Sequence, residues 1–149
     1  MTFTDPVEVI LKRKGFAVHS ISPDSTVYDA LCKMAAEDIG ALVVLEGAQA
    51  VGIFSERDYA RKVVLKDRSS RAIQVHEIMS APVLTVSYDT TVDECLRHMT
   101  AMHHRHLPVV RDGAVVGLVS IGDLVQWVVS TQDFALHQLE GYIMGKYPS

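Results

Sequence analysis

The sequence predicts a mixed α/β (α+β) fold in which two tandem β-α-β-β-α repeats pack through their sheets with pseudo-two-fold symmetry, flanked by N- and C-terminal helices. The first observation is a gapless internal repeat, because residues 18–64 align with residues 83–129 at a constant offset of 65. The second is that the hydrophobic spacing changes between helical and strand-like in the same order in both copies. The third is size, since a unit of about 50 residues buries too little surface to be comfortable alone.

Each copy opens with a short predicted strand, at residues 18–21 and 83–86, followed by a turn and an amphipathic helix. Thr26 and Thr91 are the predicted N-caps of these helices, and an acidic residue follows each of them three positions later. In the first copy the apolar residues then recur at helical spacing, at Val27, Ala30, Leu31, Met34 and Ala35. Each copy should therefore contain one helix with a single buried face.

Two apolar runs follow in each copy, and a turn signal that ends in glycine joins them. The runs are residues 41–45 and 51–54 in the first copy and residues 107–110 and 115–119 in the second. This pattern predicts one β-hairpin in each copy. A second helix is predicted to begin at Ser55 and at Ser120, again with an acidic residue three positions later.

The remaining segments connect or flank the two copies. Residues 66–72 are charged and rich in serine, which predicts an exposed linker, and a short helix is expected at residues 75–79. Further helices are expected at residues 6–14 and 132–145, and the second of these is apolar enough to dock on the core or on another subunit. The predicted division is residues 8–70 for the first repeat with the N-terminal helix, residues 75–133 for the second repeat and residues 134–149 for a C-terminal helical tail.

Composition excludes several classes of protein. With 14 basic and 18 acidic residues the chain has a net charge of −4, so it lacks the basic field that nucleic-acid binding needs. No apolar run is long enough for a membrane span or a signal peptide, and we therefore expect a cytoplasmic protein that does not interact with membranes. Cys32 and Cys95 have no metal or redox spacing and are expected to be buried, free thiols.

The most informative repeated motif is Ser-x-x-Asp at the start of the second helix, formed by Ser55 with Asp58 and by Ser120 with Asp123. One interpretation is a capping box, in which the serine and the acid satisfy backbone N–H groups of the first turn. The other is a ligand site, since a helix N-terminus attracts phosphate and a carboxylate accepts hydrogen bonds from both hydroxyls of a ribose. The motif alone leaves both interpretations open.

The two copies resemble a pair of CBS domains, the family named after cystathionine β-synthase. The resemblance rests on the β-α-β-β-α order and on the motif Gly-hydrophobic-hydrophobic-Ser-x-x-Asp, which occurs twice in register, from Gly52 and from Gly117. The flanking helices fit a stand-alone pair rather than a fragment of an enzyme. The resemblance implies a non-enzymatic regulatory module that binds an adenosine-containing ligand (AMP, ADP, ATP or NAD(H)) in clefts between the repeats.

The resemblance also implies roles for individual residues. Asp58 and Asp123 match the carboxylate that holds the ribose, whereas Ser55 and Ser120 match the hydroxyl residue near the phosphate. Arg57 matches a phosphate contact, and its counterpart Gly122 cannot perform that role, so the two sites should differ.

Two further positions are implied by the same family pattern. Arg105 and His106 stand where basic residues face phosphates, while the first copy has Gly40 and Ala41 there. The adenine is expected near the first strand of each copy, at Val18, His19, Ser20, Val83, Leu84 and Thr85.

A cluster of histidines, His98, His103, His104 and His106, is the one other notable feature. A shared metal ion is conceivable, but no cysteine or paired carboxylate completes a ligand shell, so we expect a polar helix end near the phosphates and no metal. Partial protonation there would make ligand binding sensitive to pH. Tyr59 and Trp127 follow the two motifs at helical spacing and are expected in the core or at an interface.

The leading hypothesis is a regulatory sensor of adenine nucleotides in which the ligand favours one arrangement of the two repeats and thereby biases a partner protein or a homodimer. The alternative is a structural homodimerisation module whose Ser-x-x-Asp motifs only cap helices. A third hypothesis is a small metal-dependent enzyme built on the histidine cluster, although the sequence contains no recognised catalytic motif.

Overall fold

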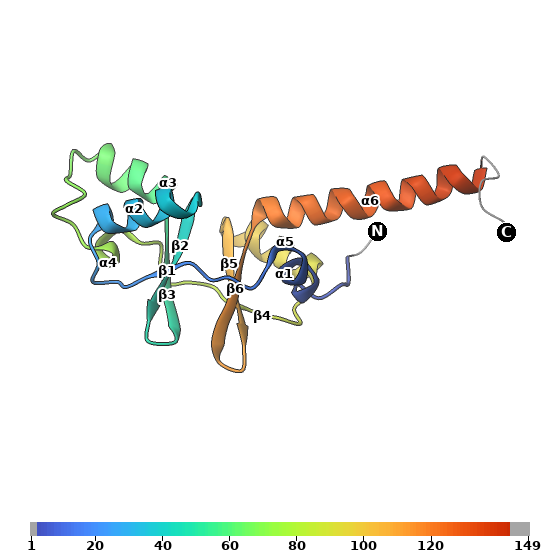
Figure 1. The fold of residues 1–149 in the computed structure, drawn as a ribbon, viewed down its shortest axis with the longest axis horizontal. Coiled ribbons are helices and arrows are strands. Elements are labelled where there is room, and N and C mark those ends of the chain that lie inside the picture. Colours follow the sequence, from blue (N-terminus) through green and yellow to red (C-terminus); the bar gives the residue numbers. More distant parts are fainter. Residues whose placement is uncertain (1–2, 144–149) are drawn as a thin grey trace.

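The computed structural model describes residues 3–143 and consists of two similar halves, each with one three-stranded sheet (Figure 1). The first half contains β1 (Ser20–Ile21), α2 (Val27–Glu37), β2 (Ala41–Glu46), β3 (Gln49–Ser55), α3 (Glu56–Tyr59) and the π-helical turn η1 (Ala60–Val64). The second contains β4 (Val86–Ser87), α5 (Val92–Met102), β5 (His106–Arg111), β6 (Ala114–Ser120) and α6 (Ile121–Ile143). Helix α1 (Glu8–Lys14) precedes the first half, and α4 (Val75–Ile78) lies between the two.

The two sheets have the same topology, which confirms the predicted repeat. In each sheet the first strand runs parallel to the second, and the second and third strands form the predicted hairpin. A bulge interrupts the hairpin after Val44 in the first repeat and after Val109 in the second, at equivalent positions. The strands β1 and β4 are shorter than predicted, because residues 18–19 and 83–85 are not paired as strand.

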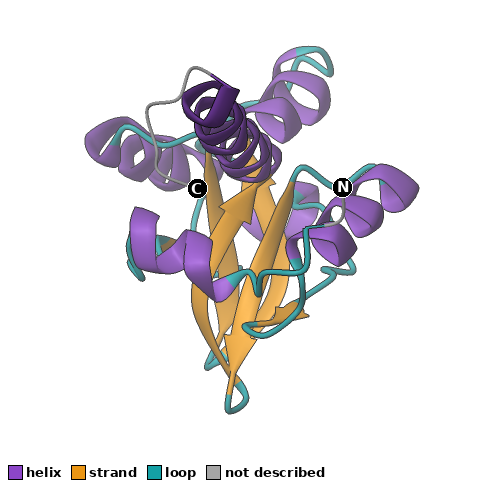
Figure 2. Ribbon diagram, turned by 90° about the vertical axis from the view of Figure 1, so that its right-hand side faces the viewer, coloured by secondary structure: helices purple, strands orange, loops and turns teal. Residues whose placement is uncertain are grey.

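The sheets pack against each other in the centre, with helices on the outside (Figure 2). Alternation along β2 explains this arrangement: Val43 faces the second sheet, while Leu42 and Val44 pack under the helices of their own repeat. Helices α2 and α5 begin as predicted, since the hydroxyls of Thr26 and Thr91 accept the backbone N–H three residues ahead at 3.1 and 3.2 Å.

The segment before each repeat packs on the other repeat. Val7, Ile10 and Leu11 of the α1 region are buried in the core of the second repeat, and α1 lies beside α5 and β6 in Figure 1. Ile73, Val75 and Ile78 of the second connection are buried in the core of the first repeat. Chain order groups α1 with the first repeat, whereas its contacts are with the second.

The cysteine prediction is half wrong. Cys95 is a buried free thiol whose pKa is raised to about 11 by burial and by the charge of Glu94. Cys32, however, is an exposed free thiol. The buried face of α2 carries Ala30 and Met34, and a residue midway between two positions four apart points to the opposite side of a helix.

Helix α6 runs without a break from the second repeat into the predicted tail. Its far part extends away from both repeats (Figure 1), so docking on another subunit stays a prediction. The side chains after Gln132 and all of residues 144–149 lie outside the described part. None of the helices in the described residues combines the length and apolar character needed to cross a bilayer.

Candidate functional site between the two repeats

A cavity of about 500 Å³, here called cleft 1, lies where the two repeats meet. The first repeat contributes the start of α3 and η1, and the second contributes the residues before β4 and before β5. Its lining includes Ser55, Arg57, Asp58, Arg105 and His106, which are predicted site residues from both repeats.

Asp58 is the one buried charged residue among the described residues, with an exposed fraction of 6%. Its Oδ2 accepts hydrogen bonds from the backbone N–H of Ser55 at 3.1 Å and from the Ser55 hydroxyl at 3.0 Å. The Asp58 N–H in turn donates to the Ser55 hydroxyl at 3.2 Å. The capping-box interpretation of this motif is therefore confirmed, and it leaves the second carboxylate oxygen of Asp58 to other partners.

Those partners are Ser80 and Lys62. The Ser80 hydroxyl donates to Asp58 Oδ1 at 2.8 Å, and Lys62 Nζ forms an ion pair with the same oxygen at 3.1 Å. Lys62 Nζ also donates to the carbonyl oxygen of Ile78 at 2.9 Å. Asp58 is thus fully hydrogen-bonded, and the hydroxyl of the exposed Ser80 is the partner that another hydroxyl can most easily replace.

Three arginines, Arg57, Arg61 and Arg105, line cleft 1 together. Within the described part of the chain none of them forms an ion pair. The charge of Arg61, some desolvation and the charge of Arg105 lower the pKa of Arg57, with Asp58 acting in the opposite direction. The positive charges of these arginines repel one another beside an open cavity, and an anionic ligand bound there would reduce that repulsion.

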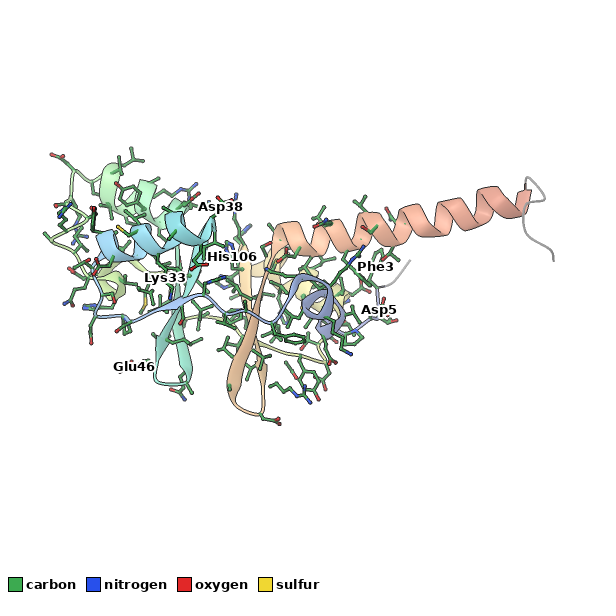
Figure 3. The ribbon with its side chains drawn as sticks, viewed as in Figure 1. Phe3, Asp5, Lys33, Asp38, Glu46 and His106 are labelled. Carbon is green, nitrogen blue, oxygen red and sulfur yellow. The ribbon has the colours of Figure 1, made fainter. Side chains whose placement is uncertain are left out.

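His106 lies at the junction of the two repeats (Figure 3), where it lines cleft 1 and also a second cavity. Burial and the charge of Lys14, followed by that of Arg105, hold its pKa below the ordinary value of histidine, whereas nearby carboxylates oppose this. An anion bound beside this imidazole would act in the same direction as the carboxylates and raise its pKa.

The second cavity belongs to the symmetry-related cleft, here called cleft 2, which contains Ser120 and Asp123. Asp123 Oδ2 accepts the Ser120 N–H at 2.9 Å, and the Asp123 N–H donates to the Ser120 hydroxyl at 3.1 Å, as in the first motif. Lys14 Nζ approaches the same Asp123 oxygen at 2.6 Å. Burial raises the pKa of Asp123, but the hydrogen bonds from Lys14 and Ser120 outweigh it and leave this pKa below the ordinary value.

The structure separates the predicted site residues into these two clefts. Cleft 1 also includes Val83 and Leu84, and cleft 2 includes His19. Three predicted adenine-pocket residues line neither cavity: Val18 packs between the sheets, Ser20 accepts a hydrogen bond from Lys33 through its carbonyl oxygen, and Thr85 is exposed.

Several residues of the clefts were not predicted. Arg61 and Lys62 extend the motif by about one helical turn beyond Asp58, so helical spacing could have identified them. Ser80 and Lys14 enter from the segments that precede each repeat, and no local pattern marks them. His103 and His104, at the end of α5, line cleft 1, while their predicted proximity to phosphates stays a prediction. No set of three His, Cys, Asp or Glu residues in the described ranges is arranged to hold a metal.

Comparisons with known proteins agree with this architecture. The family model of the CBS domain matches residues 7–65 and 75–130. CBS domain-containing protein CBSX3, mitochondrial, from Arabidopsis thaliana is 37% identical over 147 residues, which cover 93% of this chain and 71% of the relative.

Solved structures show the same similarity. A proposed signal-transduction protein with CBS domains from Burkholderia ambifaria MC40-6 has a TM-score of 0.79 and 47% identity, covering 85% of this chain and 96% of that one. A hexameric CBS-CP12 protein from bloom-forming cyanobacteria has a TM-score of 0.74 and 25% identity, covering 83% of this chain and 68% of that one. This chain therefore belongs to the CBS-domain family, as a tandem pair of CBS domains.

Proposed function

We propose that this chain is a non-enzymatic regulatory module that binds an adenine nucleotide in cleft 1. The observation that carries the proposal is the group formed by Arg57, Arg61 and Arg105, three guanidinium groups from both repeats beside one cavity. Guanidinium groups form paired, charge-assisted hydrogen bonds with phosphate oxygens. A phosphate chain held by this group would contact both repeats at once.

The charge of the cleft favours a polyphosphate. Three unpaired arginines gain more from two or three phosphates than from one, so ADP and ATP are favoured over AMP. NAD(H) carries two phosphates and remains a competing ligand of the same class.

Asp58 would bind the ribose of the nucleotide, as the arginines would bind its phosphates. One of its oxygens is fixed by the capping box, and the other accepts the Ser80 hydroxyl. A ribose hydroxyl offers the same kind of donor and would replace Ser80 without leaving the buried carboxylate unsatisfied. Val83 and Leu84 supply apolar surface for the base.

A regulatory output follows from the position of the ligand. Cleft 1 joins α3 of the first repeat to β5 of the second, so a bound nucleotide stabilises one relative orientation of the repeats over others. A partner protein or a second copy that recognises that orientation would then bind with a different affinity.

The test is isothermal titration calorimetry with ATP, ADP, AMP and NADH. Arg57→Ala and Arg105→Ala should each weaken ATP binding about 10- to 100-fold, because each removes a charge-assisted hydrogen bond worth roughly 1.5–3 kcal/mol. Their effect on AMP should be smaller.

The matched control is Arg71→Gln. Arg71 is an exposed arginine whose guanidinium stacks on the Tyr28 ring at 4.0 Å, away from the lining of cleft 1. ATP binding should be unchanged in this variant. Absence of binding heat with all four nucleotides would contradict the proposed function and leave the structural homodimerisation module as the better hypothesis.

A further inference from the structure

We infer that Lys14 is an internal plug that keeps cleft 2 closed to a nucleoside, so that the chain binds its nucleotide in cleft 1 alone. The inference rests on the proposed function and concerns the second of the two clefts that the repeat creates. It assigns a role to a lysine that lies outside both copies of the repeated motif.

Two acceptors hold the ammonium group of Lys14 in cleft 2. Lys14 Nζ donates to the carbonyl oxygen of Leu118 on β6 at 2.7 Å and to Asp123 Oδ2 on α6 at 2.6 Å. The carboxylate that would accept ribose hydroxyls therefore already holds an ammonium group. Entry of a nucleoside requires this ion pair to break.

The cavities show the same obstruction. In cleft 1 both members of the motif, Ser55 and Asp58, line one cavity of about 500 Å³. The corresponding region of cleft 2 is divided into chambers of about 310 and 220 Å³, and Lys14 lines both of them. The larger chamber contains Ser120 and the smaller contains Asp123, so the side chain separates the two members of the motif.

Cleft 1 also has a lysine on its aspartate, but that lysine does not divide the cavity. Lys62 stands four residues after Asp58, and both line the same undivided space. At the repeat offset of 65 the counterpart of Lys14 is Met79, an apolar residue of the second connection that packs against the core of the first repeat. The lysine on Asp58 thus comes from the next helical turn, whereas the lysine on Asp123 reaches in from a segment 109 positions away.

Cleft 2 also lacks counterparts of the cations that line cleft 1, and its own arginine, Arg13 in the smaller chamber, lies over the Trp127 ring at 5.6 Å from the ring centroid. At the repeat offset of 65, the cations of cleft 1 are replaced by neutral residues, and the pairs are Arg57 and Gly122, Arg61 and Gln126, Lys62 and Trp127, and Arg105 and Gly40. An opened cleft 2 would therefore favour an uncharged nucleoside over a nucleotide.

The experiment uses Lys14→Ala and two successive ligands. ATP is first added to saturation, which fills cleft 1, and adenosine is then titrated by calorimetry. Wild-type protein should bind one ATP and no adenosine, because Lys14 holds Asp123. The Lys14→Ala variant should bind one ATP and then one adenosine per chain, and adding Asp123→Ala to it should abolish the adenosine site.

Lys12→Ala is the matched control. Lys12 is on the same helix, is 64% exposed and pairs with Glu8 on its own helix at 3.6 Å. This variant should behave as wild type. Melting temperatures of all variants show whether the fold is retained.

Fluorescence gives an independent measurement. Trp127 is the only tryptophan of the chain and lines the smaller chamber beside Lys14 and Asp123. Adenosine should change its emission in ATP-saturated Lys14→Ala and leave it unchanged in ATP-saturated wild type.

Two results would overturn the inference while leaving the proposed function intact: binding of adenosine to ATP-saturated wild type, or failure of ATP-saturated Lys14→Ala to bind it. Failure of wild type to bind ATP would instead contradict the proposed function. Adenosine binding by Lys14→Ala alone, lost on adding Asp123→Ala, would still support the plug in that case.

Discussion

Asp123 shows how one side chain links the stability of the protein to pH. Its pKa in the folded protein is below the ordinary value, because hydrogen bonds from Lys14 and Ser120 outweigh the effect of burial. A carboxyl with a lowered pKa contributes stability above its ordinary pKa of about 4, and that contribution is lost as the pH falls through the folded-state pKa.

Asp123→Asn should therefore lower the free energy of unfolding by about 1 kcal/mol at pH 7, the upper end for a partly exposed ion pair. The difference from wild type should shrink as the pH falls below about 4. Urea denaturation at pH 7 and pH 3 measures both values. Asp112→Asn is the control, since that carboxylate is 94% exposed, and an equal loss of stability there would contradict the role of the Lys14 pair.

His106 gives a second pH-dependent prediction. Its pKa is held below the ordinary value by burial and by the charge of Lys14, so Lys14→Ala should raise it. ATP in cleft 1 should raise it further, and ATP affinity should therefore increase as the pH falls from 7 to 6. Titration of the imidazole resonance by NMR measures the pKa, and a pKa that ATP leaves unchanged would place the phosphates away from His106.

At this scale the sequence predicted contacts within a few residues and missed those that depend on tertiary placement. The bonds between Ser55 and Asp58 follow from a spacing of three residues at a helix start. The bond between Lys14 and Asp123 joins residues 109 positions apart, so no local pattern contains it. The exposure of Cys32 was mispredicted because its apolar character was weighed without its position on the helix face.

Among the elements, α1 depends on a glycine in the strand beneath it. A Cβ atom on Gly117 of β6 would lie 2.6 and 2.8 Å from the two methyl carbons of Leu11, a fully buried side chain. Contact between α1 and β6 therefore requires glycine at this position, and the same docking positions Lys14.

Gly117→Ala should lower the free energy of unfolding by about 1–3 kcal/mol, the usual cost of overpacking a filled core. Gly122→Ala is the control, because its Cβ would lie an ordinary 3.6 Å from the Ser120 hydroxyl. That change should be neutral or stabilising by up to about 1 kcal/mol, since alanine favours helix over glycine. Equal effects of the two substitutions in urea denaturation would show that α1 tolerates displacement from β6.

The hairpins could be predicted to within two residues at each strand end because the alternation of apolar residues and the turn residues are local, whereas the bulges were not predicted. The strands β1 and β4 were predicted too long, since their apolar residues extend past the backbone pairing: Val18 and Val83 pack between the sheets without joining a strand. Hydrophobicity thus predicted their burial and not their hydrogen bonds.

For the whole molecule, self-association is predicted on the exposed face of α6. Ile121, Val125 and Val129 recur at intervals of four residues and are 36%, 49% and 48% exposed. Such a row forms one apolar stripe on a helix, which favours contact with another subunit.

The double substitution Val125→Glu and Val129→Glu should convert a homodimer into a monomer while ATP binding is retained, because neither residue lines cleft 1. Light scattering after size-exclusion chromatography measures the mass. The control is Val64→Glu, an exposed apolar residue on η1 of the other repeat. An unchanged mass in the double variant would place the interface elsewhere.

The segment before each repeat packs on the other repeat, and this arrangement determines when each core can be completed during synthesis. Helix α1 leaves the ribosome first, yet the surface that buries Leu11 includes Val119 and Leu124 from the second repeat. The first repeat likewise waits for Ile73 and Val75 before its core is full. The core of the first repeat can therefore be completed before the second repeat is synthesised, whereas α1 must wait for β6 and α6 before it can pack.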